Sequence, residues 1–261
     1  MLTDHALALV LAGVPASITL AAAAVFALAG VVKGVVGLGL PTVSMALLAL
    51  MMPPAQAAAL LIVPSLITNV WQVRPWSGAM TLLARLAPMQ LAVFVGTLAG
   101  AWLLGAPSGA WAQLSLGVAL IVYAGIGLAG RRWPVVARTE RWLGPLCGLL
   151  TGLVTAATGV FVIPAVPYLQ ALDLQRDALV QAMGISFTVA TIALALGLYV
   201  NANYAAGDRV ASLLMLLPAL AGMYVGQVLR QRLSAAVFRT CLMGSLAVLG
   251  AHMVLHELWL R

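Results

Sequence analysis

Lys33 is the residue whose chemical type and position most directly indicate a binding site. It is the single lysine of the chain and lies in an apolar stretch, 16–36, four residues before a glycine at position 37. A lone ammonium in the hydrocarbon core of a membrane is costly, so it must face a cavity or a partner. No acidic residue lies in the centre of an apolar stretch to neutralise it, so a bound anion is an economical partner. The alternative is a lysine that snorkels to the membrane surface.

Two interruptions of the apolar pattern, residues 37–41 and 155–159, are the second candidate feature. Each precedes an apolar segment, 42–52 or 160–171, that is too short to cross a bilayer core of ~30 Å. Unwound backbone at membrane depth is tolerated only where it is buried in protein or lines water. A helix that starts after such a break presents free N–H groups that suit an anion. The alternative is that the glycines permit tight packing and the hydroxyls bond their own backbone.

Polar side chains near the breaks and in the longer apolar stretches would complete such a site. Hydroxyls and amides in membrane helices either coordinate a substrate or hydrogen-bond neighbouring helices, and the second use is commoner. The predicted substrate-binding residues are Lys33, Gly37, Gly39, Thr42, Ser44, Ser65, Asn69, Thr155, Thr158, Gly159 and Ser186.

The sequence gives little support for a catalytic or a metal-binding site. All six acidic residues fall in loops or near the ends of apolar stretches, and neither GxSxG nor HExxH occurs. His252 and His256 have the spacing that places two side chains on one helix face, but they lie near the end of the last stretch. The sequence therefore predicts no catalytic residue, no metal site, no cofactor and no enzyme activity.

The composition places these residues in a membrane. Of the 261 residues, 64% are hydrophobic and 7% are charged, whereas soluble domains carry about 25% charged residues. Proline, glycine and charge delimit ten apolar segments: 16–36, 42–52, 55–73, 79–104, 111–129, 143–158, 160–171, 178–200, 209–229 and 236–260. We expect an all-α polytopic membrane protein with about eight full transmembrane helices and two short broken or re-entrant segments.

The two halves of the chain repeat one order of break, short segment, long helix and small-xxx-small pair. An offset of 118 places Gly30 over Gly148, and after the breaks an offset of 121 places Ser65 over Ser186. Each half has five segments, an odd number, so the halves are inverted relative to each other. Inverted repeats with broken helices are typical of secondary transporters.

This repeat predicts how the single transmembrane domain is divided. Residues 1–130 form the N-terminal repeat, 131–142 a basic cytoplasmic loop and 143–261 the C-terminal repeat. Arginines concentrate in the connections that would be cytoplasmic, which agrees with the positive-inside rule and predicts that both termini are external. Arg85, near the start of its segment, is interpreted as a cytoplasmic anchor, with a gate as the alternative role.

The motifs resemble a known family. The glycine-rich stretch 30–39, the apolar run after it and the helix with Ser65 and Asn69 resemble the first half of the TauE/SafE sulfite exporter family. Residues 155–164 repeat the break, and 222–239 resemble the closing section of the family. The resemblance implies an inner-membrane permease for small sulfur-containing or organic anions, such as sulfite, sulfoacetate or other sulfonates.

The sequence as a whole predicts a secondary transporter of a small anion in the bacterial inner membrane. Alternating access would expose a substrate held at the paired breaks. The alternatives are a permease for an organic acid or a metal ion and, as weaker fits, an intramembrane enzyme or a subunit of a complex. The expected partners are the anion and the lipid bilayer, with no nucleic acid. A homodimer stays open, because GxxxG pairs pack helices within one chain as readily as between two.

Overall fold

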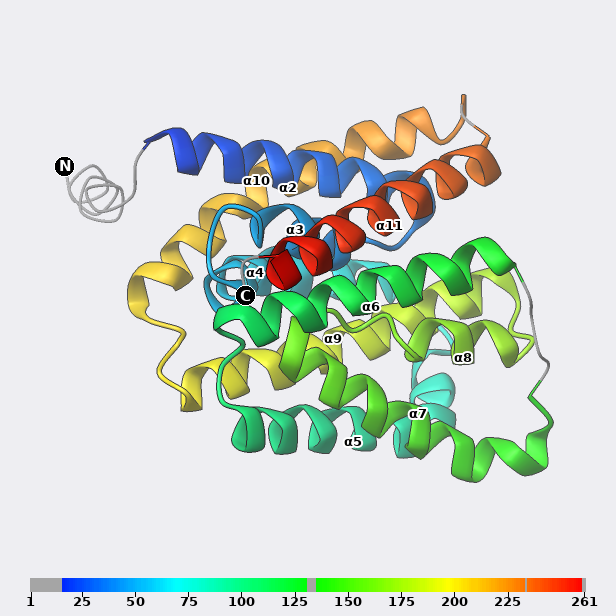
Figure 1. Cartoon of the computed structure of the whole chain (residues 1–261). Coiled ribbons are helices and arrows are strands. Elements are labelled where there is room, and N and C mark those ends of the chain that lie inside the picture. Colours follow the sequence, from blue (N-terminus) through cyan, green and yellow to red (C-terminus); the bar gives the residue numbers. More distant parts are fainter. Residues whose placement is uncertain (1–15, 131–134, 233, 260–261) are drawn as a thin grey trace.

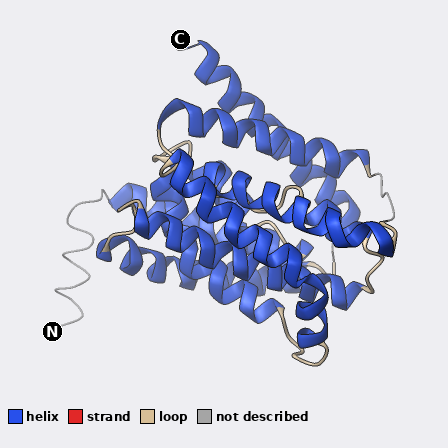
Figure 2. Ribbon diagram, turned by 90° about the horizontal axis from the view of Figure 1, so that it is seen from below, coloured by secondary structure: helices blue, strands red, loops and turns tan. Residues whose placement is uncertain are grey.

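The computed structural model describes residues 16–130, 135–232 and 234–259, and within them it is built of helices without strands (Figure 1). The ten helices are α2 Ala16–Val36, α3 Leu40–Leu48, α4 Pro54–Gln72, α5 Ala79–Leu104, α6 Gly109–Ala129, α7 Ala137–Thr158, α8 Ala165–Ala171, α9 Arg176–Val200, α10 Ala206–Leu229 and α11 Ala235–Trp259. Most loops lie at the two ends of the helix bundle (Figure 2).

Seven of these helices are long and apolar enough to cross a membrane: α2, α4, α5, α6, α9, α10 and α11. The prediction of an all-α polytopic membrane protein is thus confirmed. α7 has 22 residues and is long enough, but its first turns carry Arg138, Glu140 and Arg141. Large apolar side chains such as Leu20, Trp102 and Leu217 are more than two-thirds exposed, which suits a surface that faces lipid.

Helix packing crosses between the two halves of the chain. The most extensive contacts join α5 to α7 and α2 to α10, followed by α6 to α11, α5 to α9, α4 to α9 and α4 to α10. If each helix from α2 to α6 is exchanged with its counterpart from α7 to α11, every contacting pair becomes a pair of the same set. The α5–α7 pair, for example, becomes the α10–α2 pair. Figure 1 shows α2 and α6 running in one direction and α7 and α11 in the other. This is the pattern that two inverted five-helix repeats produce.

Glycines let the paired helices touch through their main chains. A Cβ built on Gly34 of α2 would collide with the main chain of Met223 in α10. A Cβ on Gly152 of α7 would collide in the same way with the main chain of Val93 in α5. The GxxxG pairs of α5 and α10 lie in these same two interfaces, so both are used for packing within the chain.

The bounds of the predicted repeats remain predictions. α7 begins at Ala137, so half of the stretch predicted as the basic loop 131–142 is helical, and residues 131–134 lie outside the described part. The N-terminal residues 1–15 and residues 260–261, on which the predicted external termini depend, also lie outside it.

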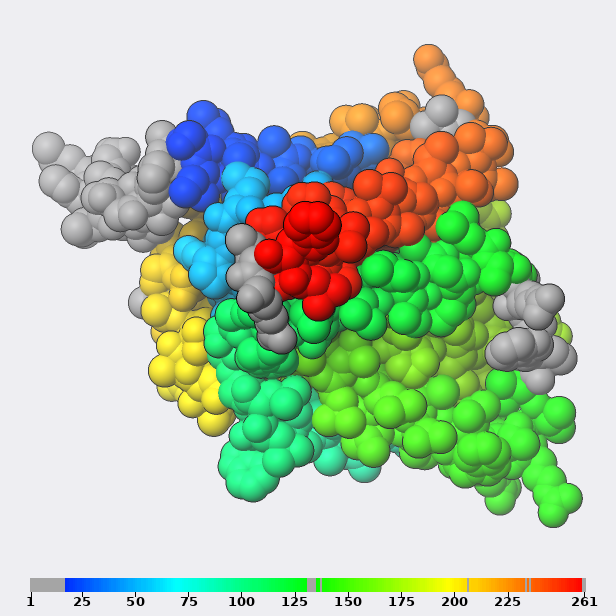
Figure 3. Space-filling view, viewed as in Figure 1, coloured from blue at the N-terminus to red at the C-terminus, as the bar shows by residue number. Residues whose placement is uncertain are grey.

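Helices α2, α6 and α11 lie side by side on one face of the molecule (Figure 3).

The first break lies where the sequence predicts it. α2 ends at Val36, and Gly37 and Gly39 follow with φ angles of 84° and 110°, which favour glycine. Gly39 is the residue that caps the N-terminus of α3.

The second break is displaced from its predicted place. α7 continues to Thr158, because Thr155 and Thr158 donate their hydroxyl hydrogen bonds to carbonyls four residues earlier and leave the helix intact. Gly159, with a φ of 68°, ends the helix, and the irregular backbone is 160–164. The prediction of an unwound stretch over 155–159, followed by a short helix over 160–171, is therefore wrong in its bounds.

Candidate functional site

Lys33 of α2 is buried, with 4% of its surface exposed, and its side chain reaches α4. Its Nζ donates one hydrogen bond to Thr68 Oγ1 at 3.1 Å and another to Asn69 Oδ1. An ammonium carries three N–H donors, so two are directed to neutral acceptors of α4 and one remains. The structure contradicts a lysine that snorkels to the surface, since the side chain is enclosed by protein.

The acceptors of Lys33 are held in place by α4 and α9. The Thr68 hydroxyl donates to Pro64 O at 2.6 Å, which leaves its oxygen lone pair directed at the lysine. Asn69 Nδ2 donates to Thr191 Oγ1 of α9 at 3.4 Å. The network therefore joins helices from both halves of the chain around one cationic group.

Three of the predicted substrate-binding hydroxyls are buried without a hydrogen-bond partner. Thr42, Ser44 and Ser65 are each fully buried, and among the described residues nothing bonds to their side-chain oxygens. Leaving a buried polar group unpaired costs about 1–3 kcal/mol, which makes each such group a candidate contact for a ligand. Ser65 is one helical turn before Thr68 and Asn69, so it shares the face of α4 that holds Lys33.

The start of α3 adds main-chain donors. The N–H of Val43 donates the first helical bond to Gly39 O at 2.8 Å, so the N–H groups of Leu40 and Thr42 precede it. Because α3 has nine residues and begins beside the unpaired Thr42 hydroxyl, its N-terminus combines the dipole and the donors that an anion requires.

The predicted binding hydroxyls of the second half are satisfied internally. Thr155 and Thr158 bond the main chain of α7, and Thr158 Oγ1 also accepts the Val160 N–H at 3.1 Å. Ser186 Oγ accepts a hydrogen bond from Gln90 Nε2 at 2.7 Å. A Cβ added to Gly159 would lie 3.0 Å from the end of the Met45 side chain, so α3 packs against the start of the second break.

Three glutamines that bond across the helices were not among the predicted site residues. Gln72 Nε2 donates to Gly37 O at 2.8 Å and ties the first break to α4. Gln90 bonds Ser186, and Gln181 Nε2 bonds the carbonyls of Val73 and Pro75. Gln90 could have been found from the sequence, because an amide in the middle of an apolar helix needs a partner.

Metal-ligating residues are dispersed over the described part of the chain. No group of three or more His, Cys, Asp or Glu side chains occurs there that could hold a metal ion. His252 and His256 stack on α11, with ring centroids 5.9 Å apart, as their spacing predicts.

A multi-pass helical bundle with crossed halves, two irregular breaks and a buried cation beside the first of them is the architecture of a membrane transporter. The chain belongs to the family described as Sulfite exporter TauE/SafE, which it matches over residues 22–253, nearly its whole length. This is a family of membrane transporters for sulfite and other anions. Comparisons with curated proteins and with solved structures give no significant match.

Proposed function

We propose that this protein is a secondary transporter that moves a small anion across the bacterial inner membrane by alternating access. Its substrate would be sulfite, a sulfonate such as sulfoacetate, or a related organosulfur or organic anion. The observation that carries the proposal is the buried Lys33, which is bonded only to neutral side chains. An anion beside Lys33 would supply the charge that stabilises it in a low-dielectric environment.

The unpaired groups around the first break support the same proposal. Sulfite and sulfonates present several oxygens, each of which accepts hydrogen bonds. Hydroxyls of Thr42, Ser44 and Ser65, the main chain at the start of α3 and the third Lys33 N–H are all donors. We therefore place the substrate nearer to the first break than to the second, where the hydroxyls are already used.

The distribution of arginine supports the proposed orientation. Figure 1 places the α6–α7 and α10–α11 connections at one end of the molecule and the α5–α6 and α9–α10 connections at the other. Arg138, Arg141, Arg230 and Arg232 lie in or next to the first pair of connections. By the positive-inside rule that end is cytoplasmic, and α2 begins on the external side.

Flux measurement in proteoliposomes tests the function directly. We expect uptake of sulfite or a sulfonate into vesicles that contain the protein and none into empty vesicles. A panel of thiosulfate, sulfoacetate, a dicarboxylate and a divalent cation separates the proposal from its alternatives. Transport of the cation alone, or of the dicarboxylate alone, would favour the metal-ion or the organic-acid permease instead.

Ser65 and Ser186, which the repeat places at equivalent positions, provide a matched pair of variants. Ser65→Ala removes an unpaired hydroxyl, so we expect unchanged or slightly higher stability and a loss of transport of about tenfold, the value of one hydrogen bond to a charged ligand. Ser186→Ala removes the partner of Gln90, so we expect the free energy of unfolding to fall by about 1 kcal/mol with a smaller effect on transport. Thermal unfolding and flux, measured on both variants, check this. Equal effects of the two substitutions on both measurements would contradict the assignment.

A further inference from the structure

A cavity of about 270 Å³ lies near the start of α5 and α7, on the side where α8 packs. Its lining includes the charged side chains of Arg85, Glu140 and Arg141, together with the ring of Tyr168. The rest of the lining is apolar or glycine. None of these residues belongs to the site around Lys33, so the cavity is a separate feature of the arginine-rich end.

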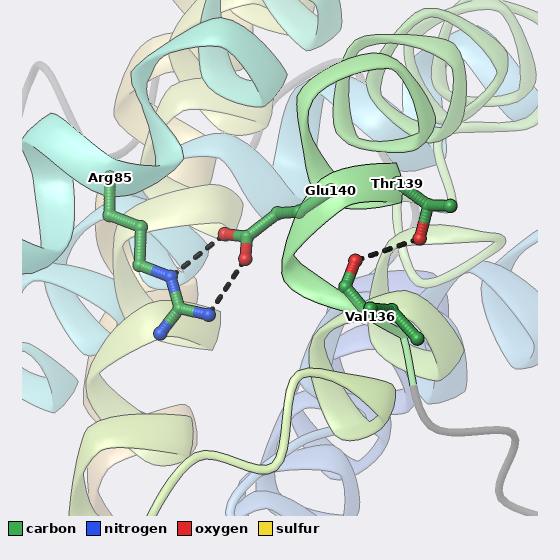
Figure 4. A network of polar contacts seen from close by, with 4 residues as sticks. All are labelled: Arg85, Val136, Thr139 and Glu140. Atoms are coloured by element: carbon green, nitrogen blue, oxygen red, sulfur yellow. Dashed lines mark hydrogen bonds and ion pairs between the residues drawn. The ribbon is translucent and has the colours of Figure 1, made fainter.

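Arg85 and Glu140 form a bidentate ion pair within this cavity (Figure 4). Arg85 Nε donates to Glu140 Oε1, and its terminal nitrogen Nη2 donates to Oε2, both at 2.8 Å. The Arg85 side chain is 44% exposed and that of Glu140 16% exposed. Because 44% of the Arg85 side chain is exposed, its guanidinium stays accessible to an anion that competes with Glu140.

Glu140 is placed by the first turn of α7. The Thr139 hydroxyl donates to Val136 O at 2.8 Å (Figure 4), and the Glu140 N–H donates to the same carbonyl at 3.2 Å. A carboxylate in the first turn is favoured by the helix dipole. Glu140 therefore stays near the cavity even when it releases Arg85.

Tyr168 supplies a hydroxyl donor to the same cavity. The residue as a whole is 5% exposed. The hydroxyl reaches Gly144, where an added Cβ would lie 2.9 Å from it. Since Gly144 also lines the cavity, the Tyr168 O–H lies at its wall.

We propose that this cavity is a second anion-binding site, in which Arg85 exchanges Glu140 for the transported anion, with Arg141 and the Tyr168 hydroxyl as further ligands. Glu140 acts as a tethered competitor for the guanidinium, so Arg85 is never left unpaired. A guanidinium binds the planar edge of a carboxylate and two oxygens of a sulfonate with the same fork of N–H donors. The inference rests on the proposed anion transport, for which this site would collect substrate at the cytoplasmic end.

Neutral substitutions of Arg85 and Glu140 distinguish a binding site from an ion pair that only holds α5 against α7. The test is calorimetric titration of sulfite into the purified full-length protein. Arg85→Gln removes the ligand, so we expect binding at this site to weaken by tenfold or more, as for loss of a charge-assisted pair. Glu140→Gln removes the competitor, so we expect binding to tighten by up to about fivefold, the value of an exposed ion pair. Arg138→Gln is the matched control, because Arg138 precedes Glu140 on α7 but does not line the cavity.

Opposite changes in the two variants are the result that supports the site. A brace between α5 and α7 would instead make Arg85→Gln and Glu140→Gln change sulfite binding in the same direction, and that outcome overturns the inference. Tyr168→Phe gives a further measure, with binding expected to weaken by about tenfold from the loss of one hydrogen bond to an anion.

A third variant keeps this test distinct from the test of the proposed function. If Lys33→Met loses sulfite binding completely while Arg85→Gln has no effect, the second site is refuted and the proposed function survives. If Lys33→Met binds and transports sulfite as well as the unaltered protein while Arg85→Gln does not bind it, the site at the breaks fails and the cavity site survives.

Discussion

Replacement of Lys33 by methionine is expected to reduce anion transport strongly and to leave a folded protein in the membrane. Methionine has nearly the length of lysine and packs well in apolar surroundings, but it removes the buried charge. Loss of a charge-assisted contact is worth about 1.5–3 kcal/mol, so transport should fall by about tenfold to 100-fold. Flux in proteoliposomes measures the loss, and size-exclusion chromatography with thermal unfolding measures whether the protein folds.

The fold is expected to survive because the partners of Lys33 have other bonds. The Thr68 hydroxyl keeps its bond to Pro64 O and Asn69 Nδ2 keeps its bond to Thr191, so only Asn69 Oδ1 loses its partner. Lys33→Arg retains the charge on a larger group, so we expect it to recover part of the flux that methionine loses.

Thr151 offers a matched control in the second half. The repeat places it at the position that corresponds to Lys33, and its hydroxyl bonds Cys147 O at 2.7 Å within its own helix. Thr151→Val should leave transport close to that of the unaltered protein. Normal flux in Lys33→Met, or an equal loss in Thr151→Val, would show that the lysine does not hold the anion.

The asymmetry between the halves explains why the predicted site residues divide into two groups. Thr42, Ser44 and Ser65 remain unpaired, whereas Thr155, Thr158 and Ser186 are bonded within the protein. The overall packing is common to both halves, while the free donors and the buried cation belong to the first. A repeat can therefore conserve the interfaces that hold the bundle together and keep binding chemistry in one copy.

Helix positions could be predicted from the sequence because the signals that end a helix are local. Glycine and proline delimit α5 at the predicted residues, 79–104, and α2 at 16–36. The second break lies after its predicted place because a threonine hydroxyl can bond the carbonyl one turn earlier and stay within a helix. The sequence pattern does not distinguish such helical threonines from those of an unwound segment.

Partners across the bundle could not be predicted, because they depend on which helices meet. Arg85 and Glu140 are separated by 55 residues, and Ser186 and Gln90 by 96. The sequence predicted that Lys33 needs a partner in the membrane. It did not indicate that the partners would be Thr68 and Asn69 of α4, nor which hydroxyls would be left over.

The glycines of the crossed interfaces give the largest expected effect on stability. Gly34→Ala adds a methyl group against the main chain of Met223, where no flexible side chain can move aside. α2 and α10 must then separate, and overpacking of this kind costs about 1–3 kcal/mol or more. We expect a lower unfolding temperature and reduced recovery from the membrane.

Gly152→Ala tests whether the two interfaces are equivalent, because it adds the same methyl group between α7 and α5. The matched control is Gly125→Ala in α6, where an added Cβ meets no atom within 4 Å. Alanine there removes the helix penalty of glycine, so we expect unfolding to become harder by up to about 1 kcal/mol. The change in stability should thus be negative where the glycine lies between packed helices of the two halves, and positive where it does not. If Gly34→Ala were as stable as Gly125→Ala, the close contact between α2 and α10 would not exist as described.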